Sequence, residues 1–245
     1  MRRSAVPAPG LIARLIALLY LLESAASVAG QLLIPGRLVL RNDAGATASN
    51  ILANEALFRV GIAGALLAVA FHLLTGVLFY YLLKPVSRTF ALLTVLLLVV
   101  ASGIQASAAL MQSGALVTLK GTASLGAFAV EQRDALALLL LAWNDQTYNF
   151  YLVFFGLWCI ALGALMMRAA FLPRLLGAGM VLAGVGYLPY LYPPFANALY
   201  PYNLVLGVGE LALVLWLVIR GVDAGRWEAA RAAGDGAALT TRSAV

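Results

Sequence analysis

The chain has 245 residues, of which 63% are hydrophobic and only 11% are charged. A mean hydropathy of +0.95 leaves too little polar surface for a water-soluble globule of this length. The net charge of +6 does not indicate nucleic-acid binding, because the basic residues are scattered at the ends of apolar runs. We therefore expect an all-α integral membrane bundle whose main partner is the lipid bilayer.

Six apolar runs predict six transmembrane helices, since a helix needs about 20 apolar residues to cross the hydrocarbon core. In chain order the runs cover about 11–30, 60–83, 89–111, 148–167, a glycine-rich stretch that begins at Pro173, and 203–219. The first run resembles a cleavable signal peptide. Arg14 and Glu23 interrupt it, however, so we expect an uncleaved first span that ends at Pro35-Gly36.

Two longer segments, 31–59 and 112–147, are more polar than the runs around them. In the first, Asn42-Asp43 can cap a helix that begins near Ala44. In the second, Gln112 to Ala129 predicts a loop or a frayed helix end, and Glu131 to Asp145 is amphiphilic. We expect one interfacial helix in each segment, lying on the outer membrane surface.

The run at 60–83 carries small residues on one side and bulky ones on the other. At helical spacing one face holds Gly61, Ala65, Ala68, His72 and Gly76. The bulky residues fall on the opposite face. We expect the small face to pack inside the bundle and the bulky face to meet lipid.

The basic residues also predict the orientation. Eleven of the sixteen lysines and arginines lie on the side shared by the N-terminus, the turns at 84–88 and 168–174, and the residues after 219, if Arg14 near the start of the first span is counted with the N-terminus. By the positive-inside rule, both termini are then cytoplasmic and the two polar segments are outside. From Arg220 the chain becomes polar and rich in Ala and Gly. We expect a six-span domain over 1–222 and a disordered cytoplasmic tail over 223–245, with one helical turn around Trp227.

Five stretches carry a family resemblance: NILANEALFR at 50–59, LLKPVSRT at 82–89, LVFFGLW at 152–158, FLPRLLG at 171–177 and GELALVLW at 209–216. In this order and spacing they resemble the bacterial multi-pass proteins grouped as domain of unknown function 4386. The resemblance implies a fold and a membrane location, and we expect this membrane to be the bacterial plasma membrane. It implies no activity, because the family has none that can be carried over.

Ionisable residues inside apolar runs are costly unless they are paired, so each is a candidate functional residue. Glu23, His72 and Glu210 all fall roughly 14 to 17 Å from the cytoplasmic ends of their spans, at about 1.5 Å per residue. Further polar residues lie towards the outside: Gln105, Asp145, Asn149 and Asn203. Together they predict a cavity that opens outward above a protonatable Glu/His/Glu floor. Alternatively, each polar residue hydrogen-bonds a neighbouring helix and only fixes the packing.

The sequence contains no reaction motif of the HExxH, GxSxG or P-loop type. One histidine cannot build a typical zinc site, and Cys159 is the single cysteine, so we expect no metal or other cofactor. Our first hypothesis is binding or translocation of a small apolar or weakly charged ligand. The alternative is a structural or regulatory membrane protein that presents its outer segments to a partner. A membrane-embedded enzyme is the least favoured hypothesis.

Overall fold

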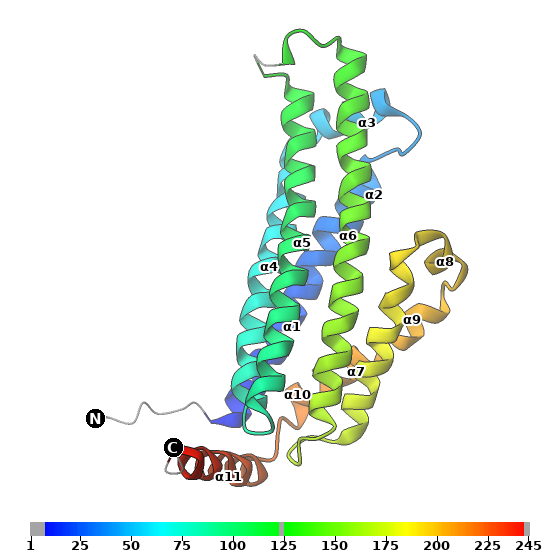
Figure 1. Cartoon of the computed structure of the whole chain (residues 1–245). Coiled ribbons are helices and arrows are strands. Elements are labelled where there is room, and N and C mark those ends of the chain that lie inside the picture. Colours follow the sequence, from blue (N-terminus) through cyan, green and yellow to red (C-terminus); the bar gives the residue numbers. More distant parts are fainter. Residues whose placement is uncertain (1–7, 123–124, 243–245) are drawn as a thin grey trace. The chain divides into compact units, whose positions relative to one another are not determined.

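The structure, a computed structural model, describes residues 8–122 and 125–242, without the side chains of 203, 204 and the residues after 234. Within these ranges the regular elements are helices (Figure 1). The first part of the chain contains α1 (Pro9–Ser27), the π-helix η1 (Val28–Leu33), α2 (Ile34–Leu38), α3 (Ala44–Ala53), α4 (Glu55–Leu83) and α5 (Arg88–Lys120). The remainder contains α6 (Val130–Met166), α7 (Arg174–Tyr187), the 3-10 helix η3 (Leu188–Leu191), α8 (Pro193–Ala198), α9 (Tyr202–Leu206), α10 (Val208–Ile219) and α11 (Ala224–Arg242).

Among the described residues, five helical stretches are long and apolar enough to cross a membrane: Pro9–Leu38, Glu55–Leu83, Arg88–Lys120, Val130–Met166 and Arg174–Leu191. The predicted all-α membrane fold is confirmed. The last predicted span takes the form of two helices, α9 and α10, which are separated at Gly207. Of these, α10 is a shorter apolar helix of 12 residues.

The first span does not end at Pro35-Gly36 as predicted, because a π-helical turn precedes the proline. The N–H of Ile34 donates to the carbonyl of Ala29, five residues back rather than four. Pro35 lies in the first turn of α2, directly after this π-helical turn. The helix therefore continues to Leu38.

The segment 112–147 is also more regular than predicted. α5 continues to Lys120, and α6 begins at Val130 and runs without a break for 37 residues. The separate interfacial helix expected at Glu131 to Asp145 is therefore the first part of α6. At 1.5 Å per residue α6 is roughly 55 Å long, well beyond the ~30 Å of a hydrocarbon core. The apolar run predicted at 148–167 is therefore only the second half of α6.

Other boundaries agree with the sequence prediction. α3 begins at Ala44, and the carboxylate of Asp43 accepts a hydrogen bond from the N–H of Ala46 at 2.9 Å, as an N-cap does. The small face of α4 is buried, with Ala65, Ala68 and His72 no more than 1% exposed, while Leu66 on the bulky face is 46% exposed. The predicted start of α3 and the predicted burial of the small face of α4 are confirmed.

By its contacts the chain divides into two compact units, and the division falls within α1, α4, α5 and α6. The first unit comprises Met1–Leu21, Leu73–Val100 and Leu152–Val245, and the second comprises Leu22–His72 and Ala101–Tyr151. This division follows spatial contacts and does not test the predicted boundary at 222, which stays a prediction.

In the first unit, glycines bring helix backbones close together. A Cβ added at Gly177 would lie 2.6 Å from the carbonyl oxygen of Gly163, and one added at Gly156 would lie 2.7 Å from that of Gly184. Both contacts join the end of α6 to α7. Gly209 of α10 packs in the same way on Gly179 of α7. The lack of side chains at these positions allows close backbone packing between these helices.

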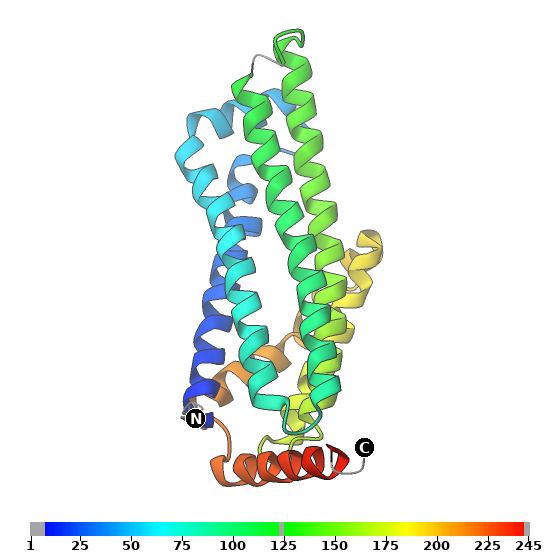
Figure 2. The same cartoon turned by 60° about the vertical axis from the view of Figure 1, so that its left-hand side comes forward.

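The first unit also includes α11, which lies crosswise to α4 and α5 near the turn that joins them (Figure 2). Trp227 is buried, and its indole N–H donates to the carbonyl of Leu82 at 2.9 Å. The composition of this segment had predicted disorder after one helical turn. The structure corrects that prediction, because the segment forms α11 and Trp227 attaches this helix to α4. The amino-acid composition of the segment does not indicate such a contact.

The core of the second unit joins the start of α6, the end of α5 and the short helices α2 and α3. Its buried members include Ile51, Phe58 at the start of α4, Ala115, Leu116 and Leu141.

Candidate functional site

In the first unit, the carboxylate of Glu210 is bound by two tyrosines. The Tyr20 hydroxyl donates to Oε2 at 2.5 Å, and the Tyr187 hydroxyl donates to Oε1 at 2.8 Å. The three side chains come from α1, α7 and α10. Tyr20 is 190 residues from Glu210 in the sequence, and Tyr187 is 23 residues from it. Glu210 therefore links three helices, and each of its carboxylate oxygens has a donor.

Aromatic rings surround this carboxylate. Tyr20 stacks on Trp158 with 6.3 Å between ring centroids, and Trp158 stacks on Phe155 at 5.3 Å. Phe155 in turn meets Tyr187 edge-to-face at 5.2 Å. Trp158 is fully buried. The rings restrict the rotamers of both tyrosines, so their hydroxyls are held in place for Glu210.

In the second unit, buried polar side chains from three helical segments meet. The Gln105 amide of α5 donates to the Ser27 hydroxyl at 3.5 Å. That hydroxyl lies 3.0 Å from the Tyr148 hydroxyl of α6. Ser27 and Gln105 are 5% and 0% exposed, so this contact is shielded from solvent.

His72 lies beside this group. Its ring is 1% exposed, interacts with the side chain of Gln105 and meets Tyr151 edge-to-face at 6.1 Å. Tyr151 also contacts Tyr148, with 5.1 Å between ring centroids. His72, Gln105, Ser27 and Tyr148 therefore form one continuous set of polar contacts, named here the histidine cluster.

A second set of polar contacts lies at the π-helix. The amide of Gln112 donates to the Gly30 carbonyl at 3.1 Å and to the Gln31 side-chain oxygen at 3.2 Å. In the π-helical register the donor to the Gly30 carbonyl would be residue 35, a proline without an N–H. Gln112 supplies the missing donor. The helical irregularity at η1 and the buried glutamine of α5 are therefore one structural feature.

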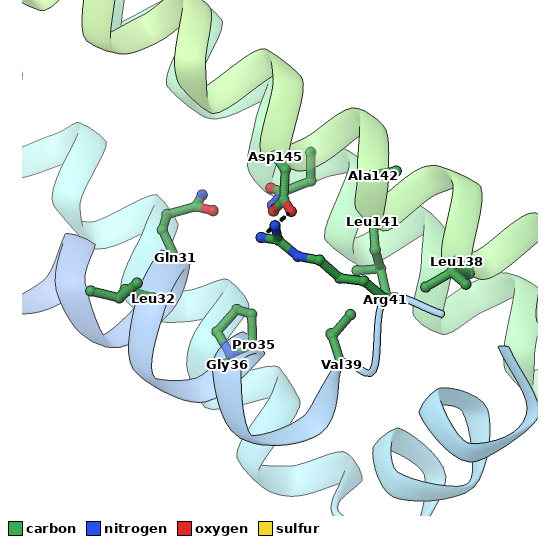
Figure 3. Close-up of a pocket in the computed structure, with 11 residues that line it drawn as sticks. Gln31, Leu32, Pro35, Gly36, Val39, Arg41, Leu138, Leu141, Ala142 and Asp145 are labelled. Atoms are coloured by element: carbon green, nitrogen blue, oxygen red, sulfur yellow. Dashed lines mark hydrogen bonds and ion pairs between the residues drawn. The ribbon is translucent and has the colours of Figure 1, made fainter. Parts of the chain in front are cut away.

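A pocket of about 290 Å³ lies beside this feature, between η1, α2 and α6 (Figure 3). Arg41 extends across it to Asp145, and their nitrogen and oxygen atoms are 2.7 Å apart. The Gln31 side chain points toward the same pair (Figure 3). The other lining residues are mostly apolar: Leu32, Pro35, Gly36, Val39, Leu138, Leu141, Ala142 and Asn144.

Two polar atoms of the pocket lining are buried without a hydrogen-bond partner among the described residues. They are Nε2 of Gln31, a donor, and Oδ1 of Asn144, an acceptor. Leaving such an atom unsatisfied costs about 1 to 3 kcal/mol. The other polar atom of each amide is hydrogen-bonded: Gln31 Oε1 accepts from Gln112, and Asn144 Nδ2 donates to Asp145 Oδ1 at 3.4 Å.

The sequence prediction had named seven residues, and the structure brings some of them together. His72 and Gln105 interact in the histidine cluster, and Asp145 lines the pocket. Glu23 is buried and accepts a hydrogen bond from Ser24 at 3.4 Å. Asn149 is half-buried and is not among the pocket residues.

Glu210 and Asn203 belong to the first unit. The side chain of Asn203 lies outside the described residues. The proximity of Glu210 to Glu23 and His72 stays a prediction, since Glu23 and His72 belong to the second unit. Among the described residues, no three His, Cys, Asp or Glu side chains lie together as metal ligands would.

Sequence reasoning missed several residues of these sites, among them Tyr20, Tyr148, Tyr187, Gln31, Arg41 and Asn144. Gln31 follows Glu23 and Ser27 at helical spacing, a signal that was available. Tyr20 and Tyr187 carry no such signal, because tyrosine is common near a membrane surface.

Comparison with known proteins adds a family. A family model described as "Domain of unknown function (DUF4386)" matches residues 15–221. The chain is 25% identical over 160 residues to an "Uncharacterized protein" of Archaeoglobus fulgidus. This alignment covers 65% of this chain and 83% of that protein. No solved structure matches the chain.

Proposed function

Because the chain belongs to the DUF4386 family, whose description names no activity, its function must be inferred from its own geometry, and we propose a small-molecule binding function for the pocket beside Asp145. The observation that carries the proposal is that this pocket combines apolar walls with two amide side chains, Gln31 and Asn144, each of which has one buried polar atom without a hydrogen-bond partner among the described residues. Its volume is close to the lower end of the range for small-molecule sites, about 300 Å³.

The lining specifies the chemistry of the ligand. Gln31 can donate one hydrogen bond and Asn144 can accept one, while Leu138, Leu141 and Val39 offer apolar surface. Arg41 and Asp145 neutralise each other as an ion pair, which leaves no net charge for an ionic ligand. A small, largely apolar molecule with one alcohol or primary amide group fits this lining.

The protonatable residues of the sequence prediction remain part of the proposal. Glu23, His72 and Glu210 would bind protons in or near the membrane interior and couple them to binding or translocation of the ligand. Gln105, Asn149 and Asn203 would extend the polar path. What supports this is the burial of Glu23, His72 and Gln105. A charged form of either ionisable group is costly there without a partner.

The membrane location follows from the apolar helices. The finer assignment is proposed: the bacterial plasma membrane, with both termini in the cytoplasm. In that orientation the pocket lies on the outer side, which would allow a ligand to enter from outside the cell.

Binding of three matched probes tests the pocket: 1-hexanol, hexanamide and hexane, measured at equilibrium on the purified protein in lipid nanodiscs, with empty nanodiscs as the blank. We expect the alcohol and the amide to bind more tightly than the hydrocarbon. Asn144→Leu should weaken hexanamide binding by about tenfold, the equivalent of one hydrogen bond of about 1.4 kcal/mol. Gln146→Leu is the control, since Gln146 is exposed on the same helix and outside the pocket.

Equal partitioning of the probes into protein-loaded and empty nanodiscs would refute the binding function. So would an equal loss of affinity in Asn144→Leu and Gln146→Leu. Either result would favour the alternative, a membrane protein that presents its outer segments to a partner.

A further inference from the structure

A second pocket, of about 380 Å³, lies within the first unit. One wall is the connection from α6 to α7, at residues 170–173, and the other runs from the end of α10 to the start of α11. None of its lining residues lines the pocket beside Asp145. Three of them are charged: Arg220, Asp223 and Arg226.

Hydrogen bonds join the two walls of this second pocket. The N–H of Asp223 donates to the carbonyl of Phe171 at 3.2 Å. The Arg226 guanidinium reaches the same connection and donates to the Ala170 carbonyl at 3.3 Å. Since α11 is also attached to α4 through Trp227, both walls are held in place by the fold. The pocket is therefore formed before any ligand binds.

The lining carries a net positive charge, because it contains two arginines and one aspartate. Both carboxylate oxygens of Asp223 already have a partner. Oδ1 accepts from the N–H of Arg226 at 3.0 Å, and Oδ2 lies 3.4 Å from the Arg226 Nε. Arg220 is exposed and makes no ion pair among the described residues. Its guanidinium is therefore available to an anion, and its planar fork of N–H donors matches the oxygens of a phosphate group.

An apolar stripe on α10 leads to this arginine. Its members are 51% to 71% exposed and recur at helical spacing: Val208, Leu211, Leu215 and Ile219. From the first to the last the helix rises about 16 Å, which is half of a hydrocarbon core of ~30 Å and so the depth of one lipid leaflet. Trp216 and Arg220 of the pocket lining directly follow Leu215 and Ile219 in the sequence. An acyl chain that lies along the stripe therefore brings its headgroup to the level of Arg220.

We propose that this second pocket binds the headgroup of an anionic phospholipid, with the phosphate paired to Arg220 and one acyl chain on the apolar stripe of α10. Basic pockets at the ends of membrane helices are suited to such headgroups. The positive-inside rule accounts for an arginine at this end of α10, but not for a preformed pocket around it. A soluble phosphate compound offers the same anion but leaves the stripe uncovered. The site goes beyond the proposed ligand function and does not depend on it.

Lipid binding measured by native mass spectrometry tests this site. The full chain is purified in detergent, stripped of lipid and titrated with dioleoyl phosphatidylglycerol or dioleoyl phosphatidylcholine, which share their acyl chains and differ in headgroup charge. We expect the wild-type protein to bind the phosphatidylglycerol about tenfold more tightly. Glycerol 3-phosphate, added as a competitor at the same concentration as the lipid, should not displace it.

Two variants of the lining should change the affinity in opposite directions. Arg220→Gln should weaken phosphatidylglycerol binding about tenfold, because it removes the charged partner of the phosphate. Asp223→Asn should strengthen binding about threefold, since asparagine also caps a helix while the opposing charge is lost. A gain in affinity cannot come from a loss of folding. Arg88→Gln is the matched control, because Arg88 is exposed in the same unit and does not line the pocket.

Equal affinities of the wild type and Arg220→Gln would overturn the lipid site. An equal loss in Arg220→Gln and Arg88→Gln would do the same, because binding would then follow the overall charge of the surface. Unchanged or weaker binding in Asp223→Asn would also contradict it, since the charge of the lining would not set the affinity. Displacement of the lipid by glycerol 3-phosphate would assign the pocket to a soluble phosphate compound instead of a membrane lipid.

Discussion

Glu210 is the residue whose partners are most completely defined, because both carboxylate oxygens accept a tyrosine hydroxyl. Removing one hydroxyl with Tyr20→Phe keeps the ring that stacks on Trp158 and deletes one hydrogen bond. We expect the free energy of unfolding in detergent micelles to fall by about 1 kcal/mol, and Tyr187→Phe to cost a similar amount.

Tyr192→Phe serves as the control for these variants, since Tyr192 is 64% exposed. Combining Tyr20→Phe with Glu210→Gln in a double-mutant cycle isolates the pair. A coupling energy indistinguishable from zero would mean that the hydrogen bond contributes nothing to stability.

The sequence showed at the residue scale which side chains are unusual and did not show which ones meet. Glu23, His72 and Glu210 were identifiable because a charge in an apolar run is costly. Tyr20 and Tyr187 were not, because a tyrosine is common near a membrane surface and its partner here lies on another helix. Asn144 was missed for a different reason: its segment was expected to lie on the membrane surface rather than within α6.

At the scale of elements, hydropathy predicted where apolar helices exist but not where they end. A helix satisfies its own backbone whether lipid or water surrounds it, so α5 and α6 continue beyond their apolar runs. Pro35 was likewise predicted to end the helix, because the π-helical turn that precedes it leaves no clear mark in the sequence. In the glycine-rich fifth run, Gly177, Gly179 and Gly184 do lie in close contact with neighbouring helices, as glycines in an apolar helix permit.

Glycine positions in α5, α6 and α7 allow a test of that packing. Gly163→Ala places a methyl group against the backbone of Gly177, so the helices must separate and the melting temperature should fall by several degrees. Gly103→Ala is the matched control, because no atom lies within 4 Å of its added Cβ. The control should be neutral or stabilising by about 0.5 to 1 kcal/mol, since alanine favours a helix interior. Equal melting temperatures for the two variants would argue against close α6–α7 packing.

At the scale of the whole molecule, the exposed surface of the helices indicates whether lipid or water surrounds them. Large apolar side chains are exposed along the helices, with Leu11 at 53%, Leu96 at 55% and Leu175 at 81%. In water such a surface would drive aggregation, whereas in a bilayer it is the expected boundary with lipid. Composition alone was sufficient for this conclusion, because it depends on a sum over the chain and not on which residues meet.

The orientation of the chain in the membrane is the remaining whole-molecule prediction. It rests on the eleven lysines and arginines that share one side of the predicted topology. In a Cys159→Ala background, Gly126→Cys and Gly225→Cys each introduce one exposed thiol, on opposite sides of the predicted membrane. A membrane-impermeant maleimide should label the first in intact cells and the second only after lysis, because α11 is predicted to be cytoplasmic. The opposite labelling pattern would reverse the topology and place the pocket beside Asp145 on the cytoplasmic side.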